Sequence, residues 1–154
     1  MLDLYNASVD VFVGSGDKAV LQSIADSTTD PDQSKRKAKV LVIDDERFIA
    51  DTLAKILNTY GYDAAAHYAG QSALDAARLE CPDIVLSDVI MPRLNGVETA
   101  LAIRELCPRV RVFLISGQAG TADLLQEARA EGHDFELLSK PLHPKELLER
   151  LASC

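Results

Sequence analysis

The chain has 154 residues, of which 47% are apolar, and its formal net charge is −8 at pH 7. This length suits one domain with a sizeable hydrophobic core. The acidic balance argues against broad binding of nucleic acids or anionic membranes. The sequence has no run of 18 or more apolar residues, so it predicts no membrane-spanning helix. We therefore expect no direct binding to nucleic acid and no association with membranes.

The ends and the cysteines of the chain favour a cytoplasmic protein. The first residues, MLDLYNASVDVF, lack the basic and long apolar regions of a signal peptide. The three cysteines, Cys81, Cys107 and Cys154, are odd in number and do not have the spacing of metal ligands. We expect them to be reduced thiols that are incidental to the structure.

Residues 1–38 differ in pattern from the rest of the chain. A short helical pattern at Asp17–Ala25 is followed by a cluster of turn-forming residues at 27–34. We interpret residues 1–38 as an N-terminal extension and flexible linker, and residues 39–154 as the folded domain.

From Lys39 on, strand patterns alternate with helical patterns. The expected strands are Val40–Ile43, Tyr62–Tyr68, Ile84–Leu86, Val110–Ile115 and Phe135–Leu138. The expected helices are Arg47–Tyr60, Gln71–Leu79, a helix capped by Asn95 and Glu98 that runs to Leu106, Thr121–Glu131 and Lys145–Leu151. The second strand is rich in alanine, so we place it near a sheet edge. Such alternation predicts an α/β fold, a doubly wound parallel sheet with helices on both faces.

Polar residues follow the four strongest strands of this pattern. They are the pair Asp44–Asp45, then Asp88 in the stretch DIVLSDVIMP (83–92), then Ser116, then Lys140. Parallel strands place their carboxyl ends at one edge of the sheet, where open α/β sheets bind ligands. We therefore expect these side chains to lie close together.

Three carboxylates at one edge repel each other unless a positive charge lies among them. Mg²⁺ would supply that charge, because it takes about six oxygen ligands and readily keeps some of its waters. We expect Asp45 and Asp88 to be direct ligands and Asp44 to hold a coordinated water. The backbone carbonyl of Ile90 could complete the protein's share of the ligands. The alternative is an acidic edge without a metal ion.

A carboxylate whose charge is offset by Mg²⁺ can attack a phosphoryl group and form an acyl phosphate. The phosphoryl oxygens need positive partners and hydrogen-bond donors. Lys140 offers an ammonium group and Ser116 a hydroxyl, each at the end of a neighbouring strand. Alone, these would be an ordinary surface lysine and an ordinary turn serine, but their matching positions favour a shared site.

At these residues the sequence resembles the receiver domain of two-component response regulators. The matching motifs are LVIDDE (41–46), LSDVIMPRLNG (86–96), SG (116–117) and KP (140–141). The resemblance covers about Lys39–Leu151. It implies a flavodoxin-like fold of five βα units with strand order 2-1-3-4-5, and a cis peptide bond between Lys140 and Pro141.

The resemblance also implies a phosphorylation-switched signalling module, which catalyses nothing beyond its own phosphorylation and dephosphorylation. In a Mg²⁺-dependent phosphorelay, Asp88 would accept a phosphoryl group from a sensor histidine kinase or a histidine phosphotransfer protein. Asp44 and Asp45 would serve Mg²⁺, while Ser116 and Lys140 would bind the phosphoryl group.

The output of such a module would pass through contacts with a downstream effector protein, made by residues 121–131, 135–138 and 145–151. The chain stops just after the last receiver helix, so we expect a stand-alone receiver, a monomer or a dimer formed on phosphorylation. Receivers usually carry an aromatic switch residue three positions before the lysine, where this chain has Leu137. Phe135 should share a face with Leu137 by strand alternation and could substitute in part.

Two other functions are weighed against this one. A metal-dependent phosphatase of the dehalogenase type also forms an aspartyl phosphate, but it needs a second acid two residues after the nucleophile, where Ile90 stands. A scaffold that binds partners without phosphorylation would usually have lost part of the five-residue set of aspartates, serine and lysine.

Overall fold

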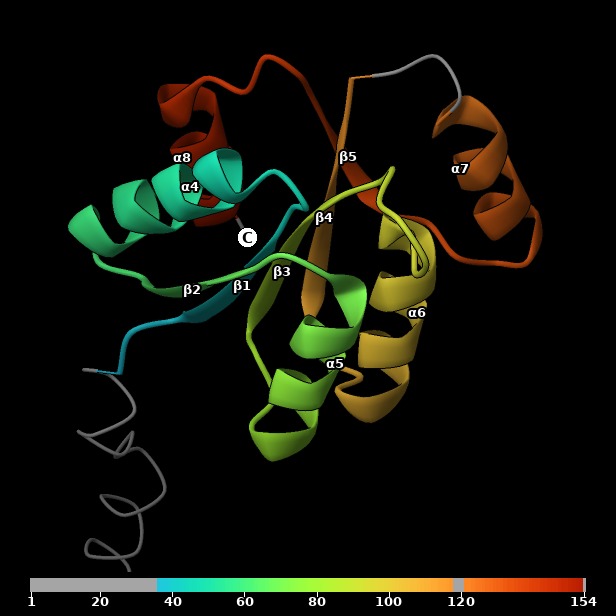
Figure 1. Cartoon of the computed structure of the whole chain (residues 1–154), viewed down its shortest axis with the longest axis horizontal. Helices are drawn as coiled ribbons and strands as arrows, with labels where there is room; N and C mark the ends of the chain where they lie inside the picture. The colour runs from blue at the N-terminus through green and yellow to red at the C-terminus, as the bar shows by residue number, and fades with distance from the viewer. Residues whose placement is uncertain (1–35, 118–120, 154) are drawn as a thin grey trace, which may run out of the picture. The chain divides into compact units, whose positions relative to one another are not determined.

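The computed structural model describes residues 36–117 and 121–153. The predicted extension, residues 1–38 with its helical pattern, falls almost wholly outside the described residues. The strands are β1 (Lys39–Ile43), β2 (Asp63–His67), β3 (Ile84–Asp88), β4 (Arg111–Ser116) and β5 (Glu136–Ser139). The helices are α4 (Arg47–Thr59), α5 (Gly70–Leu79), α6 (Gly96–Leu106), α7 (Thr121–Ala130) and α8 (Pro144–Ala152) (Figure 1).

The strands form one parallel sheet in the order β2-β1-β3-β4-β5. This order and the α/β class confirm the fold expected from the sequence. The alanine-rich strand β2 lies at an edge, as its weak pattern predicted. The peptide bond between Lys140 and Pro141 is cis, as the family resemblance implied.

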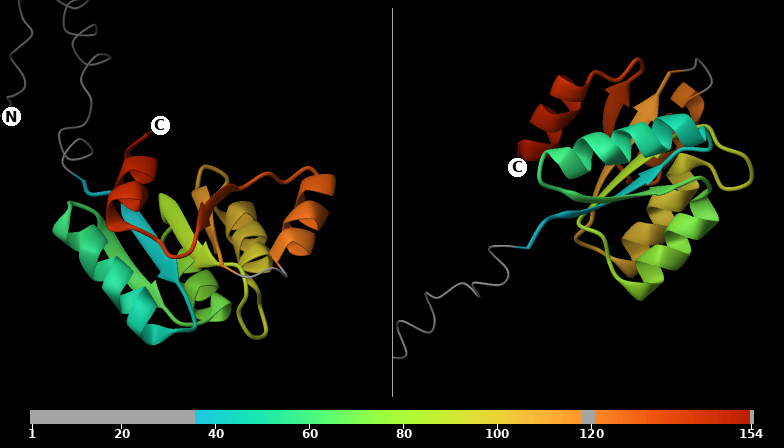
Figure 2. Two further views of the ribbon diagram at one scale, coloured as in Figure 1. Left: turned by 90° about the horizontal axis from the view of Figure 1, so that it is seen from above. Right: turned by 60° about the vertical axis from the view of Figure 1, so that its left-hand side comes forward.

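Helices cover both faces of the sheet (Figure 2). Val42, Leu86 and Phe113 are fully buried under α4 and α8. The alternate residues of the same strands, such as Val85 and Leu114, are fully buried under α5, α6 and α7. Every residue of β3 is buried, which explains why its first three residues, Ile84–Leu86, form an apolar run rather than an alternation. Among the described residues, no helix combines the length and the hydropathy needed to cross a bilayer.

The strand bounds differ slightly from those expected, and the pairing explains why. β2 is limited to Asp63–His67 because these residues pair with the five residues of β1, which leaves Tyr62 and Tyr68 outside the ladder. β3 runs on to Asp88, because Asp88 still pairs with Ile115 of β4. Apolar patterns cannot show this, since Ser87 and Asp88 are polar although they belong to the strand.

Helix α6 begins directly against the end of β3. Its capping box is as predicted: the backbone N–H of Glu98 donates to the Asn95 side-chain oxygen, and the backbone N–H of Asn95 donates to the Glu98 carboxylate. The Gly96 N–H donates to the Val89 carbonyl at 2.7 Å. A Cβ at Gly96 would overlap with the carbonyl oxygen of Asp88, so only glycine allows this close approach.

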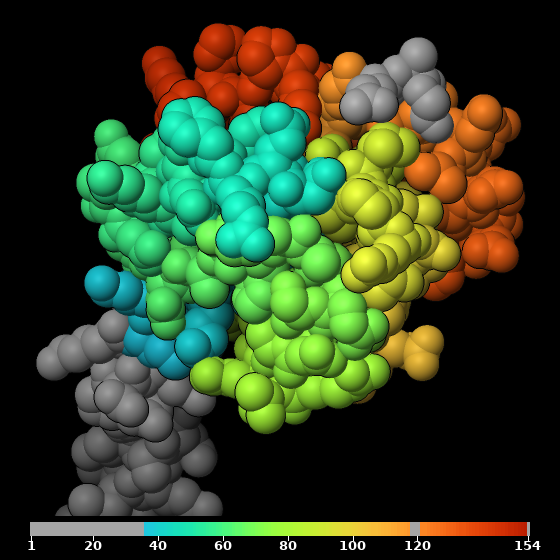
Figure 3. Space-filling view, viewed as in Figure 1, coloured from blue at the N-terminus to red at the C-terminus, as the bar shows by residue number. Residues whose placement is uncertain are grey.

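A disulfide bond joins Cys81, just after α5, to Cys107, just after α6. The expectation of three reduced, incidental thiols is therefore wrong for these two residues. They are 26 positions apart in the sequence, and only the packing of α5 beside α6 brings the ends of the two helices together (Figures 1 and 3). Cysteine spacing alone could not show this contact.

We expect Gly96→Ala to lower the free energy of unfolding by about 2 kcal/mol, because the added methyl group forces the Asp88 backbone to move. Urea denaturation measures the change. Gly61→Asn is the control: a Cβ at Gly61 meets no atom within 4 Å, and asparagine tolerates its positive φ of 97° better than most residues. A cost at Gly96 no larger than at Gly61 would contradict the close approach.

Candidate functional site

The parallel sheet brings the predicted polar residues to one edge. Asp44 and Asp45 follow β1, and Asp88 is the last residue of β3, the strand beside it. Ser116 ends β4, and its carbonyl accepts a hydrogen bond from the N–H of Lys140 at 2.9 Å. Each of these residues thus lies at or just beyond the carboxyl end of a strand of the sheet.

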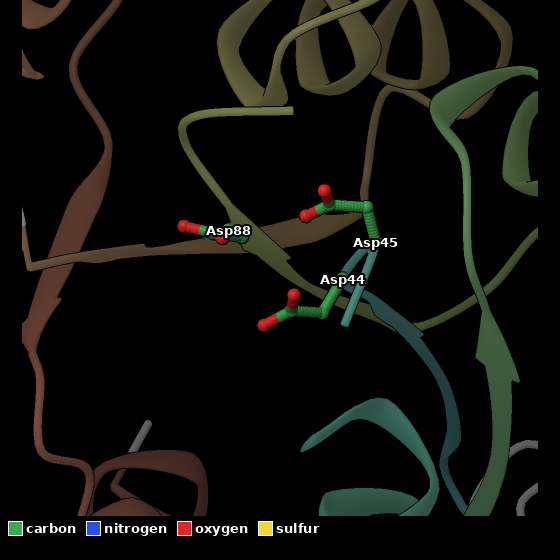
Figure 4. A group of neighbouring side chains, drawn as sticks. All are labelled: Asp44, Asp45 and Asp88. Atoms are coloured by element: carbon green, nitrogen blue, oxygen red, sulfur yellow. The ribbon is translucent and has the colours of Figure 1, made fainter. Parts of the chain in front are cut away.

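The carboxylates of the three aspartates lie near one another at the strand ends (Figure 4). One oxygen atom from each of Asp44, Asp45 and Asp88 lies within 4.8 Å of the others. Asp44 is fully buried and Asp88 is only 7% exposed, whereas Asp45 is open to solvent. This geometry is suited to a hard divalent cation that keeps some of its waters on the solvent side.

Asp44 is the most deeply buried of the three aspartates. Burial raises the pKa of its carboxyl group above the ordinary value, and the nearby Asp88 charge raises it further. The Glu46 N–H donates to Oδ1 at 2.9 Å, which opposes this rise. Oδ2 is buried without a hydrogen-bond partner among the described residues. A buried carboxylate oxygen left in this way fits a cation or a cation-bound water.

Lys140 provides the positive charge of the site. Its Nζ lies 3.2 Å from Asp88 Oδ2 and 3.7 Å from Asp44 Oδ2. Burial alone would lower the pKa of the ammonium group, but the carboxylates of Asp88 and Asp44 outweigh this effect, so the pKa is raised. Gly117 lies against the aliphatic part of Lys140, and a Cβ at Gly117 would come within 2.9 Å of Lys140 Cβ. The glycine of the SG motif therefore leaves room for the lysine side chain.

Ser116 forms a hydrogen bond that sequence reasoning missed. Its Oγ lies 2.5 Å from Oγ1 of Thr121, the buried first residue of α7. The sequence pattern identifies Thr121 only as the start of a helix. The one signal in the sequence is a second hydroxyl residue five positions after Ser116, which is too common a pattern to identify a partner.

The remaining predicted positions lie around the site. The side chain of Ile90, two residues beyond Asp88, is half-buried against the core under α5 and α6. Leu137 is 42% exposed on β5. Phe135 packs against the same core and, with Leu137, lines a small hollow. Its ring lies 4.5 Å from the guanidinium carbon of Arg104 in a cation–π contact. Both residues thus line the same hollow, although Phe135 precedes the first residue of β5, so strand alternation does not apply to it.

The pKa of Asp44 leads to a prediction about stability. Because this pKa is raised in the folded state, the stability linked to its protonated form is present at low pH. That stability is lost as the pH rises through the raised value. At pH 7 without divalent cations, Asp44→Asn should therefore raise the free energy of unfolding by about 1 kcal/mol.

Urea denaturation in a chelating buffer tests this prediction. The gain should shrink as the pH is lowered towards 4. Asp45→Asn is the control, because this side chain is exposed and its neutralisation should change stability much less. Equal effects of the two substitutions would show that burial of Asp44 is not the cause.

The family model described as the response regulator receiver domain matches residues 40–152. Over 115 aligned residues, the chain is 30% identical to the DNA-binding response regulator MtrA of Mycobacterium tuberculosis. The aligned region covers 75% of this chain and 49% of MtrA. It is 29% identical over 114 residues to the chemotaxis protein CheY of Thermotoga maritima, with 73% and 93% covered. The chain thus spans about half the length of MtrA and almost all of CheY.

Solved structures of a chemotaxis protein and a receiver domain are similar to this chain as well. The chemotaxis protein CheY4 of Vibrio cholerae matches with a TM-score of 0.67 at 30% identity, over 75% of this chain and 97% of that one. The receiver domain of NtrX from Brucella abortus matches with a TM-score of 0.63 at 29% identity, over 73% and 93%. Receiver domains bind Mg²⁺ at an acidic pocket and act as signalling modules. The chain, with its acidic cluster at the strand ends, belongs to the family of response regulator receiver domains.

Proposed function

We propose that the chain is a phosphorylation-switched signalling module in which Asp88 accepts a phosphoryl group from a phosphohistidine. The donor is a sensor histidine kinase or a histidine phosphotransfer protein, and the module works in the cytoplasm. One observation carries the proposal. The Asp88 carboxylate lies at the mouth of an acidic cluster with the Lys140 ammonium group 3.2 Å away, so a nucleophile, a cation site and a fixed positive charge meet at one point.

The aspartate cluster is the proposed Mg²⁺ site. Asp45 and Asp88 would be the direct ligands, and the Ile90 carbonyl would supply a further oxygen. The Asp44 Oδ2 atom, which accepts no hydrogen bond from the described residues, would accept one from a coordinated water. When bound, Mg²⁺ offsets the negative charge of the pocket and draws electron density from the phosphoryl oxygens.

Side chains of the protein carry out the phosphoryl transfer and bind the transferred group. An oxygen of Asp88 attacks the phosphorus, and the bond from phosphorus to the donor's imidazole nitrogen breaks. Lys140, already hydrogen-bonded to Asp88, pairs with an oxygen of the transferred group. The Ser116 hydroxyl must leave Thr121 to donate to another phosphoryl oxygen. This exchange of partners is the local event that marks phosphorylation.

A protein donor must contact the surface around Asp88, and one groove there is apolar. A hollow of about 590 Å³ between α4 and the segment before α8 is lined by Phe48, Ile56, Lys140 and Leu142, among others. The Phe48 side chain is 81% exposed, although phenylalanine is costly to leave in water. Because Lys140 lines both the groove and the site, we propose that the donor protein docks here.

The output face is the surface of α7, β5 and α8, where the exposed Leu137 offers an apolar contact to an effector protein. We propose that no nucleic acid is bound directly by this chain, because its net charge is −8. The relative MtrA is named a DNA-binding regulator, but the chain spans only 49% of it.

Incubation with acetyl phosphate and Mg²⁺, followed by intact-mass measurement, tests the proposal. We expect one added phosphoryl group, which is absent from Asp88→Asn and from the wild-type chain in excess chelator. Asp45→Asn, which keeps the acceptor, should raise the Mg²⁺ concentration needed for half-maximal modification by at least about tenfold.

Two other results of these measurements would support the two alternative functions. No adduct from acetyl phosphate or from any histidine kinase would favour a scaffold that works without phosphorylation. Steady release of phosphate from monoesters would favour a phosphatase.

The bond between Ser116 and Thr121 gives a second prediction. Thr121→Val keeps the shape of the side chain but frees the Ser116 hydroxyl, so phosphorylation by acetyl phosphate should become roughly fivefold faster, the equivalent of about 1 kcal/mol for one hydrogen bond. Thr121→Ser should restore the wild-type rate. In a Ser116→Ala chain the valine substitution should have no effect, and a fivefold effect there would contradict this role of Thr121.

A further inference from the structure

The disulfide between Cys81 and Cys107 lies far from Asp88, where the chain leaves α5 and α6. Both helices have their amino ends at the edge of the sheet that carries Asp88, and both run away from it (Figure 1). The two cysteine residues are unequally exposed. Cys81 is exposed, whereas Cys107 is only 4% exposed. An incoming thiol can therefore reach the sulfur of Cys81 much more easily than that of Cys107.

A hollow of about 310 Å³ lies beside this bond. Cys81, Asp83, Cys107, Pro108 and Arg109 are among the residues that line it. This volume is of the order that small-molecule sites occupy in proteins. The disulfide thus forms part of the wall of a surface hollow and is not enclosed in the core.

The charged groups around the hollow leave one cation available. The carboxylate of Asp83 accepts a hydrogen bond from the Lys39 N–H at 2.7 Å. Glu80, next to Cys81, pairs with Lys39 Nζ at 3.1 Å. Arg109 is exposed, and it forms no ion pair with any residue that the structure describes. A carboxylate of a small molecule in the hollow would find the Arg109 guanidinium as its partner.

We propose that Cys81, Cys107 and Arg109 form a thiol–disulfide exchange site for an anionic low-molecular-weight thiol and its disulfide. Cys81 is the sulfur that exchanges with the small molecule, Cys107 is the resolving sulfur, and Arg109 holds a carboxylate of the small molecule. This proposal is independent of phosphorylation at Asp88.

The chemistry is two successive exchanges. The Cys81 thiol loses its proton to solvent, and the thiolate attacks one sulfur of the small disulfide. This forms a mixed disulfide at Cys81 and releases one small thiolate. The Cys107 thiolate, its proton also lost, then attacks the Cys81 sulfur, which closes the protein disulfide and releases the second thiolate. The protein is oxidised by two electrons and the small disulfide is reduced to two thiols, and excess thiol drives both steps backwards.

Oxidation would tie the carboxyl ends of α5 and α6 together. At its other end α6 abuts the Asp88 backbone through Gly96, and the first residue of α5, Gly70, packs against Leu94 in the loop before α6. Compartments rich in thiols keep ordinary cysteines reduced, and disulfides there are mostly transient or redox-sensing. An accessible bond from α5 to α6, the helix that abuts the Asp88 backbone, is suited to such a role.

The first experiment counts free thiols in the full chain carrying Cys154→Ser. After equilibration with mixtures of reduced and oxidised glutathione, the chain is alkylated with N-ethylmaleimide and weighed. We expect two alkylated cysteines under reducing conditions and none under oxidising conditions, with full reversibility. Two free thiols under every condition, or a bond that excess glutathione does not open, would overturn the proposal.

The second experiment assigns the two sulfurs in the same background. With oxidised glutathione, Cys107→Ala should trap one glutathione on Cys81, whereas Cys81→Ala should leave the buried Cys107 unmodified over the same time. Circular dichroism and the melting temperature show whether each variant is folded. Equal or faster modification of Cys107 in a folded Cys81→Ala chain would overturn the assigned roles.

The third experiment tests Arg109 with two small disulfides of opposite charge. Arg109→Gln should slow the closing of the bond by oxidised glutathione, which carries carboxylates, by about three- to fivefold, as expected for one unit charge a few ångströms away in water. The same variant should react with cystamine, which carries ammonium groups, at least as fast as the unsubstituted chain. An equal slowing with both reagents, or with neither, would overturn the role of Arg109.

Discussion

Repulsion among the carboxylates of Asp44, Asp45 and Asp88 is the interaction on which the rest of this structure depends. The parallel sheet forces these groups together, because the carboxyl ends of β1 and β3 are adjacent. Lys140 is the one ammonium group that the described structure pairs with this cluster, and a single cation cannot neutralise three carboxylates. The remaining negative charge is suited to attract a divalent ion. The pKa of the Asp44 carboxyl group is raised chiefly by its burial, and the neighbouring charge of Asp88 raises it further.

Much of the fold and the place of the site could be predicted from the sequence, and the reasons are physical. Apolar runs such as Ile84–Leu86 mark strands buried on both faces, and the glycine and proline stops mark the ends of helices. Once the strands are parallel, residues that follow them must share an edge. Asp88 and Lys140, 52 positions apart, were therefore expected to meet, and they lie in hydrogen-bond contact.

What the sequence could not show depends on side-chain contacts between elements. The partner of Ser116 depends on how the first turn of α7 packs beside the end of β4, and no periodicity encodes that distance. The pairing of Cys81 with Cys107 likewise depends on the lengths of α5 and α6, which end level with each other. Even the glycine at 117 reads as a turn residue until Lys140 is seen to pass beside it.

The contact between Gly96 and the Asp88 carbonyl also limits how motion can leave the site. The connection from β3 to α6 is held at both ends, since the Gly96 N–H is bonded to Val89 and the capping box fixes Asn95. We therefore expect a shift of the Asp88 backbone to move α6 as well, because these bonds leave the connection little freedom to absorb it. Cys107 follows the other end of α6, so a covalent bond at one end of the helix and a change of charge at the other would act on the same element.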